Sequence, residues 1–116
     1  MKFYSVTGET LDQEQLKTEF GKARAFGVVR AGETCLFFRS GLKEYFVPYH
    51  AIGRCFRRVQ MVPARMCCGK GEFQIESLVV CVEEKEVAQI QLPGTRAAQA
   101  LIEKLKTKIP GCIFSK

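Results

Sequence analysis

Residues 88–109, AQIQLPGTRAAQALIEKLKTKI, decide the fold class, because a strand pattern gives way to a helix pattern within them. Up to Leu92, apolar side chains alternate with glutamines, which predicts a strand with one buried face and one solvated face. Pro93-Gly94-Thr95 ends this strand and supplies a threonine cap. Beyond it, apolar residues recur every three or four positions and predict an amphipathic helix over Thr95–Ile109. We expect this helix to pack on the sheet through Ala98, Leu101, Ile102 and Leu105.

Upstream of this stretch, short apolar runs are separated by Gly, Pro and charged turns, which is typical of consecutive antiparallel strands. In the run at 73–82, one face is apolar, whereas Gln74 and Glu76 point the other way. Glu83–Glu86 follows it as a turn. Besides the strand that ends at Leu92, we predict strands at about 26–30, 34–39, 44–49 and 73–82.

Residues 54–62 fit two patterns. Their apolar residues form either a short helical stripe or one side of a strand. We favour the strand, because Gly53 and Pro63 limit any helix here to about two turns, and so short a helix gains little from its own hydrogen bonds.

The N-terminal part of the chain is predicted to be helical. Thr10-Leu11-Asp12-Gln13 has the form of a capping box, which predicts a helix over Thr10–Lys22. Residues 1–6 could supply one further strand. The chain is therefore predicted to be a single α+β domain, with an N-terminal helical extension over 1–25 and a core over 26–109.

Length and composition agree with one domain. The chain has 116 residues, of which 47% are hydrophobic, enough for one core. The N-terminal residues contain no long apolar stretch of the kind that secretion or membrane spanning requires, so we expect a cytoplasmic protein.

The chain contains six cysteines, and in a reducing compartment we expect all of them to be free thiols. Cys35 and Cys81 lie in apolar runs and are predicted to be small core residues. No Cys-x-x-Cys spacing occurs, and adjacent Cys67 and Cys68 cannot easily ligate one tetrahedral metal. We therefore predict no metal site and no cofactor.

Two segments resemble parts of a known family. Thr34–Arg39 resembles the early hairpin of the bacterial pleckstrin-homology-like (PH-like) domains, and Tyr45–Ile52 resembles the Pro-Tyr-x-x-Ile segment that follows it. Residues 94–109 look like the helix that caps the same domains. The resemblance implies a barrel or a strongly bent sheet. The family has seven strands where six are counted here, and its helix often carries a Trp, which this chain lacks.

The resemblance also implies a binding or assembly module without catalytic activity, because such domains generally bind phospholipid head groups, peptides or other proteins. Lipid-binding members resemble one another in a basic first hairpin, whereas the turn Ala31-Gly32-Glu33 is short and acidic. We therefore expect a protein partner or self-association, and no small-molecule substrate is indicated.

One stretch of the chain is basic. Arg54, Arg57, Arg58, Arg65 and Lys70 account for most of the net charge of +6, with no acidic residue among them. Such a stretch could attract an acidic protein or an anionic membrane, and nucleic acid is the less expected partner. In a strand, however, Arg57 points away from the face of Arg54 and Arg58, and charges on an edge strand also protect it from aggregation. Both interpretations stay open.

An enzymatic alternative depends on His50, which is the only histidine. A thiol enzyme could pair His50 with Cys67 or Cys68, one of which a nearby lysine could also make redox-sensitive. No local signature of such a nucleophile is present, so we predict no catalytic residue and treat His50 as a turn residue.

Overall fold

The computed structural model describes residues 2–63 and 72–115. The chain has an α+β arrangement in which most strands follow one another between an N-terminal and a C-terminal helix, as the sequence predicts. The elements are β1 (Phe3–Ser5), α1 (Gln13–Lys22), β2 (Arg24–Phe26), β3 (Val29–Ala31), β4 (Cys35–Ser40), β5 (Lys43–Pro48), the 3-10 helix η1 (Tyr49–Ala51), β6 (Arg54–Pro63), β7 (Glu72–Val82), β8 (Lys85–Leu92) and α2 (Thr95–Lys108).

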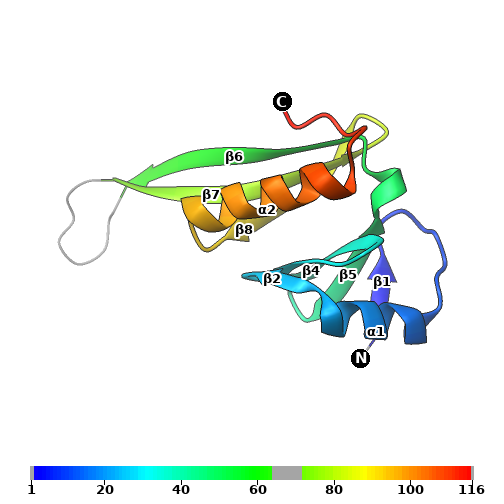
Figure 1. The fold of residues 1–116 in the computed structure, drawn as a ribbon. Helices are drawn as coiled ribbons and strands as arrows, with labels where there is room; N and C mark the ends of the chain where they lie inside the picture. The colour runs from blue at the N-terminus through cyan, green and yellow to red at the C-terminus, as the bar shows by residue number, and fades with distance from the viewer. Residues whose placement is uncertain (1, 64–71, 116) are drawn as a thin grey trace.

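The strands form two sheets. The first has the order β1-β5-β4-β3-β2, and the second has the order β6-β7-β8 (Figure 1). All pairings are antiparallel except that between β1 and β5. Within the described residues no strand pairs across the two sheets, so the closed barrel that the PH-like resemblance implies is not found there.

Helix α2 completes the main core. It contacts all three strands of the second sheet and also β2 and β3 of the first sheet. Ala98, Leu101 and Leu105 are fully buried in this core, as predicted, whereas Ile102 is only partly buried. The helix therefore holds the two sheets around one apolar interior.

A smaller core lies on the opposite face of the first sheet, under α1. Leu16 packs there with Phe3, Phe37 and Phe46. The rings of Phe3 and Phe37 meet edge to face at 5.4 Å between centroids, a favoured aromatic geometry. Phe3 in β1 and Leu16 in α1 thus share a core with the strands that follow them.

The structure corrects the start of α1. The helix begins at Gln13, and Asp12 is its N-cap, with a side chain that accepts a hydrogen bond from the backbone N–H of Glu14. The predicted capping box from Thr10 is therefore wrong. The Gln13 amide instead bonds the backbone of Phe3, as acceptor at 2.8 Å and as donor at 3.0 Å, which ties α1 to β1.

Other strand predictions change in detail. The predicted strand at 26–30 is the hairpin β2–β3, whose turn passes through Gly27 with a φ of 70°. The favoured strand at 54–62 is confirmed as β6. The β7 face that carries Glu76 is not solvated as its polar residues suggested, because Glu76 is buried there beside Leu78 and Val80.

Candidate binding groove

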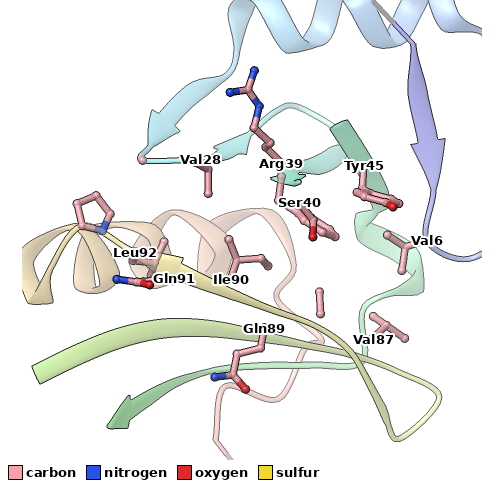
Figure 2. A pocket seen from close by; sticks show the side chains of 14 residues that line it. Val6, Val28, Arg39, Ser40, Tyr45, Val87, Gln89, Ile90, Gln91 and Leu92 are labelled. Atoms are coloured by element: carbon pink, nitrogen blue, oxygen red, sulfur yellow. The ribbon is translucent and has the colours of Figure 1, made fainter. Parts of the chain in front are cut away.

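A groove of about 850 Å³ lies between β8 and the first sheet. One wall is the strand β8 from Val87 to Leu92, continued by Pro93. The other wall comes from the β2–β3 turn, the end of β4, the start of β5 and Val6. Figure 2 shows side chains from these two walls facing one another across the groove. A volume of this size is in the range of ligand-binding clefts.

The groove is lined by both apolar and polar groups. Phe38 and Tyr45 from the first sheet stack with ring centroids 5.5 Å apart. On the β8 side, Ile90 and Leu92 are buried, because the alternation of the strand turns them toward the main core. Apolar side chains from both walls thus meet on this surface.

The two ends of the groove differ in how they are closed. At one end the β2–β3 turn approaches β8 so closely that a Cβ on Gly27 would lie 2.8 Å from Pro93 Cδ. The positive φ of Gly27 independently disfavours any other residue there. Val6 and Val87 line the other end of the groove, where Val87 stays 37% exposed (Figure 2).

The only charged side chain among the described residues that line the groove is Arg39. Its guanidinium points away from β8 in Figure 2, and its Nε lies 3.6 Å from Glu44 Oε1. Burial raises the pKa of Glu44, and the nearby Arg39 only partly offsets this. Besides Arg39, the polar side chains that line the groove are all neutral: Ser40, Tyr45, Gln89 and Gln91.

The free edge of β8 borders this groove. Among the described residues, β8 pairs with β7 on one side and with no strand on the other. The outer edge of β6 is different, because the C-terminal tail covers its start: Cys55 donates a backbone hydrogen bond to Ile113, and Ile113 donates one to Gly53. Of the two outer edges of the second sheet, that of β8 is therefore the more accessible.

The described residues of the predicted basic surface are all engaged with other groups. Arg54 donates to the backbone oxygen of Ser115, and Arg58 donates to Glu86 and Gln89. Arg57 is paired with Glu76 on the α2-facing side of the sheet. The three arginines are thus split between two faces, as a strand requires. The other two members of the basic surface, Arg65 and Lys70, lie outside the described residues.

The structure describes only one of the three residues on which the enzymatic alternative depends. His50 lies in η1, exposed, with Nε2 3.0 Å from Glu9 Oε2. Cys67 and Cys68 lie outside the described residues. The remaining cysteines are free and buried, and burial raises the pKa of each of these thiols: Cys35, Cys55, Cys81 and Cys112.

A second cavity, of about 460 Å³, lies between α1 and the β3–β4 turn. Its lining mixes acidic and basic side chains, and Glu19 is already bound there. The Glu19 carboxylate accepts hydrogen bonds from the backbone N–H groups of Thr34 and Cys35 at 2.9 and 2.8 Å. This cavity is thus built around a contact that fastens α1 to the first sheet.

The sequence did not single out the groove, although it contained two signals for it. The uncharged alternation of residues 87–92 indicates a strand without edge protection, and Gly27 marks a tight turn. Which strand lies opposite β8 depends on long-range packing, and no local pattern specifies that.

Comparisons of the chain with protein-family models, with curated proteins and with solved structures give no match. In the described part of the chain, no helix is long and apolar enough to cross a membrane. The same residues contain no group of three or more His, Cys, Asp or Glu side chains that could hold a metal ion.

Proposed function

We propose that the chain is a noncatalytic binding module of the PH-like type that recognises a protein partner through the groove beside β8. The observation that carries this proposal is the groove itself: a cavity of about 850 Å³, lined by both apolar and polar groups and bordered by a strand edge that no described strand pairs with. Apolar clefts with a few polar groups are the usual form of a recognition site.

The order of elements supports the PH-like part of the proposal. From β2 to β8 there are seven strands, the number that the resemblance expects, in groups of four and three. They are followed by α2 in the position of the capping helix. The segment that resembles the family's Pro-Tyr-x-x-Ile motif forms η1 and its flanking residues Pro48 and Ile52, which connect the two sheets.

The charges favour a protein over a lipid head group or a nucleic acid. Cationic donors bind phosphate most strongly, and among the described residues the one cation on the groove wall, Arg39, points away from β8 and lies 3.6 Å from Glu44. The described arginines of β6 are engaged with protein groups. We therefore expect weak binding to anionic vesicles and to nucleic acid at physiological salt.

A matched pair of variants tests the proposal. Ser40 lines the groove, whereas Leu42, at the tip of the same β4–β5 hairpin, is fully exposed and lies outside it. We would select twelve-residue peptides from a random display library against the wild-type chain and measure their affinity by fluorescence anisotropy. Ser40→Trp fills the groove and should weaken binding at least tenfold, whereas Leu42→Trp should change it less than twofold.

Two results would contradict the proposal. If the library yields no peptide that binds the folded chain, the groove is not a peptide-recognition site. If Ser40→Trp and Leu42→Trp bind the selected peptides equally well, the peptides use another surface. Sedimentation of the free chain tests self-association separately: a dimer that Ser40→Trp dissociates would mean that the groove serves assembly instead.

A further inference from the structure

We propose that the groove binds its partner by strand addition, in which an extended peptide segment pairs with the free edge of β8 as a fourth strand of the second sheet. This inference rests on the proposed function and specifies the chemistry of the partner: a flexible, uncharged segment with apolar side chains at alternate positions.

The first argument is the hydrogen bonding of β8. In an antiparallel pair, the backbone groups of alternate residues bond the neighbouring strand, and those of the other residues point outward. On β8 the inward groups meet β7, and no described strand meets the outward ones. These outward groups lie on the side of β8 that borders the cavity of about 850 Å³, and an added strand would lie about 4.8 Å from β8. The complementary ligand for such an edge is an extended backbone.

The second argument is the missing protection of this edge. Natural proteins usually block exposed edge strands with charges, prolines or covering segments. The outer edge of β6 has two of these devices: Pro63 and the C-terminal tail at Ile113. On β8 the charges are confined to its first two residues, Lys85 and Glu86, whereas residues 87–92 carry no charge and no proline, and a proline follows only at position 93. The outer edge of β6 is thus protected against strand pairing, whereas residues 87–92 of β8 are not. This difference is expected if only β8 must accept a strand.

The third argument is the arrangement of side chains. A strand added to β8 would continue the two faces of the sheet, because successive residues of a strand point to opposite sides. Alternate ligand residues would then extend the row of Ile90 and Leu92 and lie beneath the stacked rings of Phe38 and Tyr45. The residues between them would lie on the side of Gln91, which is exposed. Six paired residues span about 20 Å, enough for about three apolar contacts.

The shape of the groove favours a flexible segment over a second folded copy of this chain. The edge of β8 forms one wall of the groove, and the β2–β3 turn and the β4–β5 hairpin form the other. To pair two copies through β8, both recessed edges would have to come within about 4.8 Å of each other, and the opposite walls would collide. A single extended segment carries no second wall of this kind, so it can enter the groove without this collision.

Hydrogen exchange and backbone methylation test this inference with the peptides selected above. In the free chain, the outward amide groups of β8 should exchange rapidly, and saturation with a selected peptide should slow their exchange at least tenfold. One series of peptides is N-methylated at every second residue, at the positions whose N–H groups would face β8. This series should bind at least tenfold more weakly, because methylation removes the donors to β8. A second series is N-methylated at the residues in between, whose N–H groups would point away from β8. Its affinity should fall less than threefold.

The outcomes separate strand addition from groove binding in general. If peptides bind and Ser40→Trp blocks them, but β8 amide exchange is unchanged and both methylation series behave alike, strand addition is wrong and the proposed function stands. If no peptide binds, the proposed function fails as well. If β8 amides become protected at high protein concentration without peptide, a second copy occupies the edge, and the commitment to a flexible segment is wrong.

Discussion

Arg57 and Glu76 form a partly buried ion pair on the α2-facing side of the second sheet. Arg57 Nε donates a 2.9 Å hydrogen bond to Glu76 Oε1, and Gln74 Nε2 donates one of 3.3 Å to the other carboxylate oxygen. The Glu76 side chain is 1% exposed, whereas that of Arg57 is 29% exposed. The pair lets a charged residue occupy a buried position in β7, so Arg57 serves the fold and is not free to bind an acidic partner.

Removing Arg57 should therefore destabilise the chain more than removing Arg58. Arg57→Ala leaves the Glu76 carboxylate buried with only a neutral donor, and we expect it to lower the free energy of unfolding by about 2 to 4 kcal/mol. Arg58 bonds the more exposed Glu86, so Arg58→Ala should cost about 1 kcal/mol or less. Urea unfolding of the two variants measures both values. Equal losses would show that the burial of Glu76 does not govern the stability of this sheet.

Helix α2 should contribute a large share of the stability. Leu101 is fully buried between the sheets, so Leu101→Ala removes apolar contacts and leaves a cavity. We expect a loss of about 2 to 5 kcal/mol in the free energy of unfolding. Gln99, on the exposed side of the same helix, provides the control, and Gln99→Ala should change stability by less than about 0.5 kcal/mol. A loss below that level for Leu101→Ala would mean that α2 does not pack as described.

The sequence predicts the elements of this fold better than their assembly. Hydrophobic alternation and the helical stripe identify β8 and α2 directly, because each period reflects one buried face of one element. The start of α1 is missed because the side chain of Gln13 bonds the backbone of Phe3, ten residues away, instead of capping the helix. A capping pattern within four residues carries no information about that contact.

The candidate site is even less accessible to sequence reasoning. The basic stretch is visible as a run of charges, but its solvation depends on partners from distant strands, such as Glu76 for Arg57 and Glu86 for Arg58. Likewise Glu76 looks like a solvent-facing residue in an alternating strand, although it is buried on the face whose Leu78 and Val80 belong to the main core. The groove arises between two sheets that share no strand pairing, so no local pattern predicts it.

Glu44 should make the stability of the chain depend on pH. Burial raises its pKa above the ordinary value of 4.5, and its Oε2 is buried without a hydrogen-bond partner among the described residues. A raised folded-state pKa stabilises the protein below the unfolded pKa, and this stability is lost as pH rises through the folded pKa. Glu44→Gln imitates the protonated carboxyl. Its urea midpoint should therefore exceed that of the wild type at pH 7, and the difference should vanish toward pH 4.

Glu33 provides a control of opposite sign for this pH dependence. Its hydrogen bond with Lys108 lowers the pKa of Glu33, so the stability it contributes is present above the ordinary pKa and is lost as pH falls. Glu33→Gln should thus have a lower urea midpoint than the wild type at pH 7, with the gap closing in acid. If the urea midpoints of both variants shift in the same direction at pH 7, the opposite directions assigned to the pKa shifts of Glu44 and Glu33 are wrong.

The cysteines should divide into two kinetic classes. Burial raises the pKa of Cys35 to about 11, so only about one thiol in a thousand is ionised there at pH 8, and Cys55, Cys81 and Cys112 are also buried with raised pKa values. Because the thiolate is the reactive species, these four should react with Ellman's reagent only as fast as the chain unfolds. Cys67 or Cys68, the reactive-thiol candidates of the sequence analysis, should supply the fast phase. The double variant Cys67→Ser/Cys68→Ser should abolish the fast phase and keep four slow thiols that react at once in denaturant. A fast phase that survives in this variant would show that one of the four buried cysteines is open to solvent.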